Sequence, residues 1–371
     1  MKLEPFEMER MQSTWENIVE FNLSESGVHP MSLSELLADD PETLKGLLNA
    51  GLGYVQSNGT IPLREKIAAL YRDATPDHVL VTTGTSEANH LNIWNLVETG
   101  DEVIFMLPNY MQIWGIARGF GGAVRSFSLR EENGWRPDLD ELRKAVTPRT
   151  RVIAVCNPNN PTGAILTEEE MEAIAGIARK QGCWLLADEV YQGAERDRGR
   201  TPSFWGRYEK VIVTNGLSKA YGIPGIRIGW TVAPPDRIAK LWSYHDYTTI
   251  GPGTLSDRIA QIALAKREVI LARTRSILNK NYPILLEWIR NHGDMFTMVE
   301  PHAGAIAYLK YKLAINSTDL VNKLRIEKNV LIVPGDHFGM DHFLRIGYGS
   351  PTDHLHTALN RIHDTLAALN R

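Results

Sequence analysis

Short apolar runs recur along the first two thirds of the chain, and each is followed by a turn signal and an amphipathic segment. Runs of this length suit strands that are buried on both faces, and their alternation with amphipathic segments is typical of a parallel sheet covered by helices. The pattern therefore predicts an α/β fold. The expected strands are residues 79–83, 103–107, 152–155, 184–187 and 211–214.

One connecting helix can be predicted closely from its ends and its apolar face. Thr167 followed by Glu170 forms a capping box, in which each side chain satisfies a backbone N–H group of the other residue. Gly182 is expected to end the helix, because glycine accepts the left-handed conformation of a helix cap. The apolar stripe between these ends consists of Met171, Ile174, Ala175 and Ala178.

After about residue 255 the pattern changes to longer helical segments with separate strands, which predicts a second α/β domain. Its strands are expected at residues 305–311, 330–333 and 343–348. Its last helix has a clear start, since Ser350, Pro351 and Asp353 supply an N-cap, a first-turn proline and an acid near the helix N-terminus.

The first 30 residues contain no clear strand and are expected to form an arm over the small domain or the entrance of a site. A length of 371 residues suits two domains at roughly 150 residues each. The expected division is an arm with part of the small domain (1–35), a large domain (36–255) and a small C-terminal domain (256–371).

Composition narrows the class of partner. The formal net charge of -4 gives no cationic surplus, so we expect a small-molecule partner rather than nucleic acid or an acidic membrane. Cys156 and Cys183 are too few for a disulfide framework. Residues 1–10 lack the apolar stretch of a secretory signal, and no apolar run approaches the roughly 20 residues that span a membrane. These observations predict a cytoplasmic protein.

Polar motifs follow the predicted strands, at the edge where ligands bind in open α/β sheets. Gly84-Thr85-Ser86 leads into a helix, so its backbone N–H groups and two hydroxyls suit a phosphate, although such a junction is more often a simple turn. The run Asn157-Pro158-Asn159-Asn160-Pro161-Thr162-Gly163 is more specific. Its prolines restrict the backbone and hold the amide side chains at a fixed angle, and a rigid loop is the simpler alternative.

Charged and phenolic residues follow the later strands. Asp188 ends one strand, and Tyr191 comes three residues later. Ser218-Lys219 follows the next strand, and Arg227 lies eight residues beyond the lysine. Each residue alone has an ordinary explanation, such as a helix cap or a solvated charge. Their order and spacing together are more specific than any one of them.

These motifs, from about Tyr54 to Arg345, resemble those of the class I/II aminotransferases, the fold-type-I enzymes that use pyridoxal 5'-phosphate (PLP). The resemblance implies a mostly parallel seven-stranded sheet in a large domain, with a small α/β domain. It implies that Lys219 is the Schiff-base lysine, that Asp188 pairs with the pyridine nitrogen, and that Tyr191 and Asn160 bond the 3-oxygen of the ring. The residues it assigns to the phosphate are Gly84, Thr85, Ser86, Ser218 and Arg227.

The same resemblance assigns roles to three further residues. Tyr110 matches the aromatic residue that stacks on the ring. Arg345 matches the arginine that grips the α-carboxylate, a task for which a planar guanidinium is suited. Tyr54 matches the tyrosine that reaches the phosphate of the neighbouring subunit, which implies a homodimer with shared active sites. Asp188 would keep the ring nitrogen protonated, and Lys219 would move the Cα proton.

The chain departs from the family pattern in two places. The family usually has a serine two residues before the serine–lysine pair, and here that position is Gly216, so one phosphate hydroxyl is missing. We find no obvious second arginine for a dicarboxylate substrate. The N-terminal arm is instead rich in acids, which a solvated face explains most simply. They are Glu4, Glu7, Glu9, Glu16, Glu20 and Glu25.

Residues 21–29 and 108–115 resemble the capreomycidine synthase-like PLP enzymes, which cyclise hydroxylated arginines. This resemblance implies deprotonation at Cα by Lys219, loss of a side-chain hydroxyl, and addition of a guanidine nitrogen in its place. Ordinary transamination uses the same lysine, aspartate and arginine, so the motifs leave both reactions open. The expected substrate-binding residues are Arg345, Asn160, Gly27, Glu9 and Glu25.

Two other classes of function are disfavoured. A non-catalytic PLP-fold module of a regulator is one, but no helix-turn-helix segment precedes residue 40 and every core catalytic position is occupied. A metal enzyme is the other. Asp336, His337, Asp341 and His342 cluster without a recognised ligand spacing, and a polar loop explains them more simply. We therefore expect no metal.

Overall fold

The computed structural model describes residues 3–38, 40–197 and 199–369. Its largest element is a sheet in which every strand is parallel except β9, which is antiparallel to both neighbours, and β5, which is antiparallel to β4. The strand order is β2 (Val79–Thr82), β9 (Gly229–Val232), β8 (Val211–Gly216), β7 (Trp184–Asp188), β6 (Thr150–Cys156), β3 (Glu102–Leu107), β4 (Ala123–Arg130) and β5 (Arg136–Pro137).

The prediction of a mostly parallel sheet is confirmed, but its count of seven strands is wrong. The eighth strand is β5, only two residues long at the edge of the sheet. It exists because the chain turns back after β4 through Gly134, whose φ of 70° is left-handed, and pairs with Leu129 and Arg130.

The two faces of the sheet pack against different helices, because alternate residues of each buried strand point to opposite faces. One face contacts α5 (Thr85–Leu96), α6 (Gln112–Gly119) and α9 (Pro235–His245). The other packs against α4 (Ile61–Ala68), α8 (Glu168–Gln181), α10 (Thr254–Ala265) and α11 (Arg267–Asn291). The remaining helix of this layer is α7 (Leu139–Ala145), beside β4.

The predicted details of α8 are confirmed. Thr167 and Glu170 form the reciprocal capping box, and Gly182 ends the helix with a left-handed φ of 72°. All four residues of the predicted apolar stripe are buried against the sheet.

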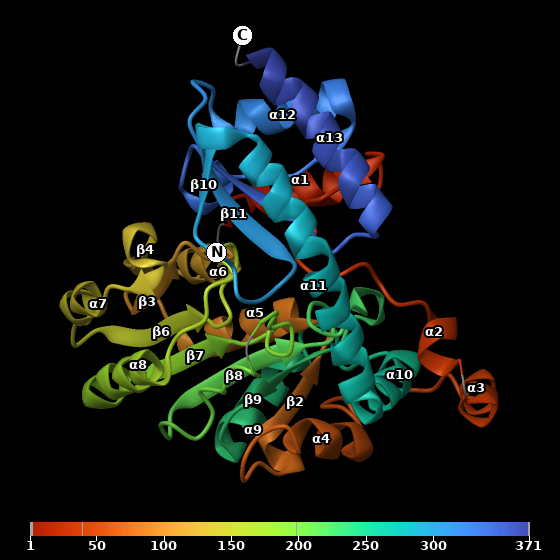
Figure 1. Cartoon of the computed structure of the whole chain (residues 1–371). Helices are drawn as coiled ribbons and strands as arrows, with labels where there is room; N and C mark the ends of the chain where they lie inside the picture. The colour runs from red at the N-terminus through yellow and green to blue at the C-terminus, as the bar shows by residue number, and fades with distance from the viewer. Residues whose placement is uncertain (1–2, 39, 198, 370–371) are drawn as a thin grey trace.

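The C-terminal part forms a smaller antiparallel sheet with its own helices, above the large sheet in Figure 1. Its strand order is β10 (Phe296–Met298), β11 (Ile306–Tyr311), β14 (Phe343–Gly347) and β13 (Val333–Pro334). The predicted strand at 330–333 is divided, since β12 (Val330–Leu331) pairs elsewhere. The helices are α12 (Ser317–Lys328) and α13 (Thr352–Leu369), with the carbonyl of Pro351 accepting the first helical bond of α13 from Leu355.

The N-terminal arm belongs to this smaller unit. It begins with α1 (Glu7–Trp15), which lies beside the small sheet in Figure 1. The expectation that the first 30 residues contain no strand is wrong, because β1 (Phe21–Asn22) pairs in parallel with β12. Two short helices follow and project from the body (Figure 1): α2 (Leu33–Leu37) and α3 (Pro41–Leu48).

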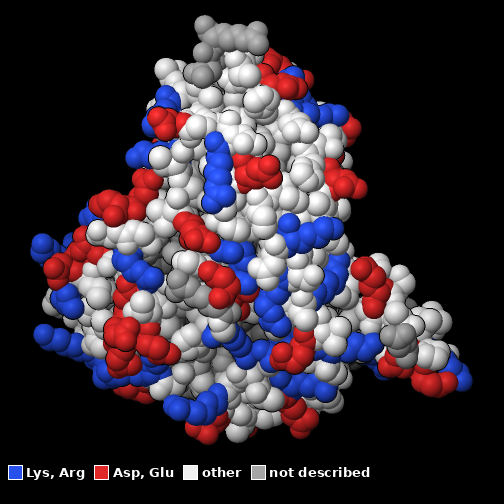
Figure 2. Space-filling model, viewed as in Figure 1, with Lys and Arg blue, Asp and Glu red and all other residues white. Residues whose placement is uncertain are grey.

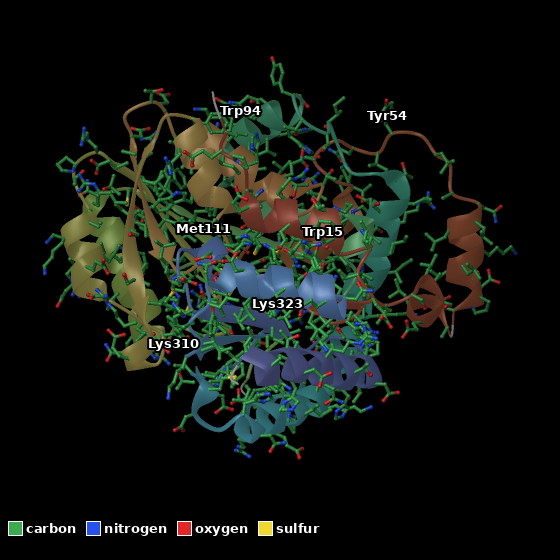
Figure 3. The ribbon with its side chains drawn as sticks, turned by 90° about the horizontal axis from the view of Figure 1, so that it is seen from above. Trp15, Tyr54, Trp94, Met111, Lys310 and Lys323 are labelled. Carbon is green, nitrogen blue, oxygen red and sulfur yellow. The ribbon has the colours of Figure 1, made fainter. Side chains whose placement is uncertain are left out.

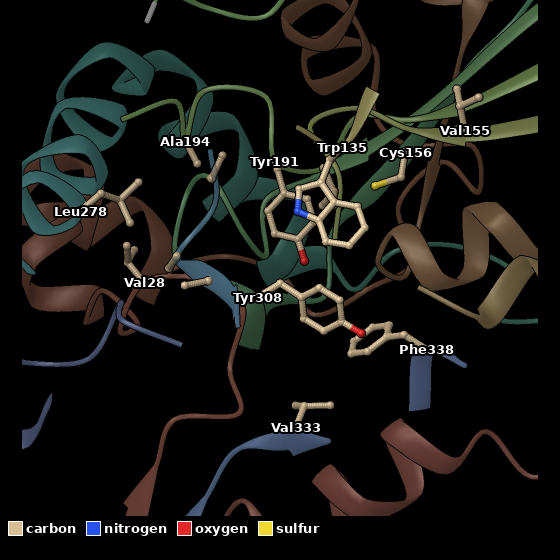
Figure 4. Packing of buried hydrophobic residues seen from close by; sticks show 14 of the residues in the cluster. Val28, Trp135, Val155, Cys156, Tyr191, Ala194, Leu278, Tyr308, Val333 and Phe338 are labelled. Carbon is tan, nitrogen blue, oxygen red and sulfur yellow. The ribbon is translucent and has the colours of Figure 1, made fainter. Parts of the chain in front are cut away.

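Aromatic rings join the small unit to the large sheet. Trp135, next to β5, lies 5.9 Å from the ring of Tyr308 on β11, and Tyr308 in turn packs edge-on against Phe338 (Figure 4). All three side chains are buried. This contact fixes the small sheet over the carboxyl edge of the large one, which is where the predicted site residues lie.

Charged side chains of both signs are interspersed on the face seen in Figure 2. Among the described residues, no helix has the length and apolar character needed to cross a membrane.

Candidate active site

A cavity of about 280 Å³ lies where the carboxyl ends of the parallel strands meet the N-terminal arm. Most of the predicted site residues line it, which follows from topology, because the ends of β6, β7 and β8 meet at one edge of the sheet. The predicted residues that line the cavity are Glu9, Glu25, Thr85, Ser86, Tyr110, Asn160, Asp188, Tyr191, Ser218, Lys219, Arg227 and Arg345.

Lys219, three residues beyond β8, faces a carboxylate from the arm. Its Nζ lies 3.3 Å from Oε2 of Glu25. Burial disfavours the charged lysine, but the Glu25 carboxylate and then Tyr191 outweigh burial, so the pKa of Lys219 is raised. The positive charge of Lys219 is in turn the main cause of the lowered pKa of Glu25.

Asp188 is buried at the end of β7, with both carboxylate oxygens fixed. Oδ2 accepts a hydrogen bond of 3.0 Å from the amide of Asn89, and Oδ1 accepts one of 3.1 Å from the N–H group of Val190. Burial raises the pKa of Asp188, and these two donors oppose that shift. The site therefore holds a carboxylate that gains from a nearby cation, as the nitrogen of a protonated pyridine ring would provide.

Tyr191, Asn160 and Arg345 form a buried hydrogen-bonded chain. The amide of Asn160 donates to the hydroxyl of Tyr191 over 3.1 Å, and Arg345 donates to the other end of that amide over 2.9 Å. Tyr191 donates to Ser26 Oγ over 2.8 Å, and Arg345 donates to the carbonyl oxygen of Ser24 over 2.5 Å. The arm thus supplies one hydrogen-bond partner to Tyr191 and one to Arg345, at the two ends of this network.

The start of α5 forms the part of the cavity suited to a phosphate. Gly84 is its N-cap, with a left-handed φ of 81°, and no side chain caps the helix. A Cβ on Gly84 would lie 2.4 Å from a guanidinium nitrogen of Arg227, so the arginine lies directly against this backbone. The hydroxyl of Thr85 is buried without a hydrogen-bond partner. A buried unpaired hydroxyl, a helix N-terminus and an arginine together fit a phosphate group.

The missing hydroxyl at Gly216 has a structural reason. A Cβ at this position would lie 2.5 Å from Oγ1 of Thr85 and 3.0 Å from the carbonyl oxygen of Ile228. The space that a side chain at 216 needs is therefore occupied by the threonine hydroxyl, which itself lies in the cavity wall.

Tyr110 and Glu9 form a second contact between the large domain and the arm. The tyrosine hydroxyl donates to Glu9 Oε1 over 2.8 Å, and the ring packs edge-on against Phe6 at 5.0 Å. Glu9 therefore already has a hydrogen-bond partner within the chain.

Several cavity residues carry no sequence motif and were missed. Met8 and Gln12 reach the cavity from α1, and Glu16 reaches it from the residue that follows this helix. Gln12 also holds Ser24 through hydrogen bonds of 2.9 and 3.1 Å. Asn89 and Gln112 reach it from α5 and α6. Because Asn89 lies on α5 about one turn after the Gly84 turn, helical spacing could have indicated it as a site residue. The arm residues have no such local signal, since the pairing of β1 with the distant β12 brings them to the site.

Three predicted residues are not part of the cavity lining of the described chain: Gly84, which adjoins it as the N-cap of α5, Gly27 and Tyr54. The ideal Cβ of Gly27 would be 3.4 Å from the Cα of Lys219, so this glycine lets the arm pass close to the lysine backbone. Tyr54 is fully exposed, on an outer segment seen at the rim of Figure 3.

The aspartates of the cluster at residues 336–342 accept hydrogen bonds from the first residues of α12. Asp336 accepts from the hydroxyl of Thr318 over 2.7 Å, and Asp341 accepts from the N–H group of Ser317 over 2.8 Å, both at the start of α12. Within the described ranges, no group of three or more His, Cys, Asp or Glu residues is placed to hold a metal ion.

The chain matches the family of class I and II aminotransferases over residues 38–362. It is 33% identical to capreomycidine synthase of Streptomyces vinaceus, over 93% of this chain and 89% of that protein. The structure of a PLP-dependent aminotransferase from Streptococcus suis 89-1591 superposes with a TM-score of 0.95 at 33% identity, covering 100% of both chains. The structure of the PLP-dependent cyclase OrfR superposes with a TM-score of 0.91 at 25% identity, covering 99% of this chain and 98% of that one.

These likenesses agree with a cavity whose Gly84–Arg227 end fits a phosphate and whose lysine and buried aspartate line the same space. The cofactor is pyridoxal 5'-phosphate, and the chain belongs to the class I and II aminotransferases, as a PLP-dependent enzyme of that family.

Proposed function

We propose that this enzyme acts on an L-amino acid with a cationic side chain, and specifically that it converts a hydroxylated L-arginine into a cyclic guanidino amino acid with loss of one water. The observation that carries the proposal is a set of three carboxylates from the arm, Glu9, Glu16 and Glu25, that line the cavity of Lys219.

The charges of the cavity support a cationic side chain. Among the described residues, its cations are Lys219, Arg227 and Arg345. If the lysine joins the cofactor, Arg227 holds the phosphate and Arg345 binds the α-carboxylate, no cation remains for a second substrate carboxylate. Burial, with the neighbouring carboxylates of Glu25 and Glu9, raises the pKa of Glu16. A guanidinium would relieve that repulsion and form paired hydrogen bonds with a carboxylate.

Each residue then has one task. The bound cofactor supplies an electron sink for the bond that breaks at Cα. Lys219 Nζ takes the Cα proton, and Asp188 stabilises the positive charge on the ring nitrogen. Arg345 orients the substrate through its carboxylate. The side-chain hydroxyl leaves with one proton as water. A guanidine nitrogen, positioned by the arm carboxylates, then forms the new C–N bond and gives up a proton, and Cα regains a proton, so that the net change is the loss of one water.

The test is product analysis with arginine and its hydroxylated derivatives. The proposal predicts a product lighter than a hydroxyarginine by one water, formed without a 2-oxo acid. A 2-oxo acid product, formed only when a second 2-oxo acid is supplied as acceptor, would show that the enzyme transaminates instead.

An ordinary aminotransferase is the second candidate. It is favoured by the likeness to the Streptococcus suis aminotransferase, which is as close in sequence as capreomycidine synthase. It needs the same lysine, aspartate and arginine, so only the product distinguishes the two reactions.

We also propose a homodimer in which Tyr54 completes the partner's phosphate site. The support is that Tyr54 is fully exposed and that two exposed leucines, Leu48 and Leu52, precede it in the sequence. Light scattering should give twice the chain mass, and Tyr54→Phe should weaken PLP binding without changing that mass. A monomer with full PLP affinity would contradict the proposal.

A further inference from the structure

The arm segment that carries Glu25 is fixed to the small sheet on both sides of this residue. The carbonyl oxygen of Leu23 accepts from Gly347 over 2.7 Å, and that of Ser26 accepts from Ala305 over 3.2 Å. A Cβ on Gly347 would lie 2.2 Å from the carbonyl oxygen of Glu25, so strand and arm are in direct backbone contact. Glu25 is therefore held in place by the fold and is not a residue of a loose loop.

The side chain of Glu25 is directed at the amine of Lys219. Its Oε2 lies 3.3 Å from Nζ, and the two side chains keep 51% and 27% of their surface exposed, respectively. Gly27, two residues further, passes close to the lysine backbone. The carboxylate thus faces the atom that forms the covalent link to the cofactor.

Four other groups around Lys219, namely Tyr191, Glu9, Arg345 and Asp188, already have partners of their own. Tyr191 donates to Ser26, Glu9 accepts from Tyr110, and Arg345 donates to Asn160. Asp188 is held by Asn89 and Val190, and Glu16, directly after α1, lines the same cavity. In the described chain, Glu25 is the carboxylate that forms an ion pair with the lysine. The charged or titratable groups facing the lysine are Glu25, Tyr191, Arg345 and Glu9. Those that line the same cavity are Glu16, Tyr110, Cys156, Asp188 and Arg227.

We propose that Glu25 holds a proton on Nζ of Lys219, and that a guanidinium group entering the cavity takes this carboxylate from the lysine. The inference rests on the proposed function, since it assumes that Lys219 bears PLP and that the substrate is cationic. It would leave more of the lysine amine unprotonated, and so free to accept the Cα proton, once a cationic substrate is bound, because the partner that favours its charged form is then engaged elsewhere.

The direction of the titration follows from the pair. A carboxylate beside the nitrogen favours the protonated form, so the wild-type nitrogen keeps its proton to higher pH than a variant without that charge. The raised pKa of Lys219 and the lowered pKa of Glu25 agree with this sign.

The experiment is a pH titration of the visible absorbance of the PLP-loaded protein. Glu25→Gln should lower the midpoint by about one pH unit, a roughly tenfold change in the acid constant. Glu16→Gln is the matched control from the same cavity. It should shift the midpoint by less than about a third of the shift expected for Glu25→Gln, because this carboxylate has no direct contact with the lysine. A Glu25→Gln midpoint equal to that of wild type would overturn the inference.

A second measurement avoids the variant altogether. 4-Guanidinobutyrate has a guanidinium and a carboxylate but no α-amine, so it cannot replace the lysine on the cofactor. It should lower the wild-type midpoint, whereas hexanoate, which lacks the cation, should not. Equal midpoints with both compounds would contradict the proposed exchange of partners.

The outcomes also separate this inference from the proposed function. If PLP gives no visible band with the wild-type protein, the proposed covalent role of Lys219 fails. If the band is present but its titration ignores both Glu25→Gln and 4-guanidinobutyrate, only the role of Glu25 fails.

Discussion

The two ends of the cavity are built in different ways. The sheet end, with Lys219, Asp188 and the Gly84 turn, comes from residues that follow buried strands within a few positions. The arm end, with Glu16 and Glu25, comes from a segment held by pairing to β12 and β14, more than 300 residues away. In the proposed assignment, the sheet end serves the cofactor. The arm end is the natural place for selectivity, because it can change without disturbing the sheet.

The largest effect is expected at the sheet end, from Lys219→Ala. Loss of the amine should remove the visible PLP band and reduce turnover by a thousandfold or more, on the order of the contribution of a general base. Lys240→Ala, on the exposed face of α9, is the control. Both proteins should keep the wild-type far-ultraviolet circular dichroism. Substantial turnover by Lys219→Ala would remove the central assignment.

Asp188→Asn should have the next largest effect. The variant keeps the size of the side chain but loses the charge that stabilises a protonated ring nitrogen, so turnover should fall on the order of a hundredfold while PLP still binds. Asp236→Asn, at the start of α9, provides the matched control. Unchanged kcat in Asp188→Asn would mean that this carboxylate does not face the ring.

Gly216→Ser tests the packing of the sheet end. The new Cβ would lie 2.5 Å from Oγ1 of Thr85, so PLP affinity should fall by about tenfold, the size expected for a modest overpacking penalty. Thr85→Ala alone should also weaken PLP binding, because its hydroxyl fits the phosphate, but in the double variant it removes the close contact, so the loss should be smaller than the two single losses combined. Gly176→Ser, where a Cβ meets nothing within 4 Å, is the control. If the losses of the two single variants simply add in the double variant, the two positions are not coupled.

The arm end should show the smallest and most selective effect. Glu16→Gln should raise KM for a guanidino substrate by about fivefold, as for an ion pair of roughly 1 kcal/mol, and should leave PLP affinity unchanged. Norleucine, which lacks the cation, should show no such change. An equal rise of KM for both amino acids would assign Glu16 a structural role.

The sequence predicts the sheet end well for a physical reason. Central strands such as β6 and β7 are buried on both faces and therefore appear as continuous apolar runs. β4 does not appear as an apolar run because only Phe127 and Leu129 of it are buried, and β9 does not because it is short and begins with glycine. The same logic holds for the site, since Asp188 and Lys219 follow their strands directly.

The arm end could not be predicted in the same way. The contact between Glu25 and Lys219 joins residues 194 apart, and the bond from Tyr191 to Ser26 joins residues 165 apart. Neither contact has a local pattern, because both depend on how β1 and the following segment pair with the small sheet. Acid content of the arm indicated Glu9 and Glu25 as candidates, but not that Glu9 would bond Tyr110.

The central claim is that the cofactor is attached to the amine of residue 219. The most direct measurement is to reduce the PLP-loaded protein with borohydride, digest it and map the modified peptide by mass spectrometry. The account predicts a stoichiometric phosphopyridoxyl adduct on the peptide that contains Lys219. An adduct on another lysine, or none at all, would contradict it.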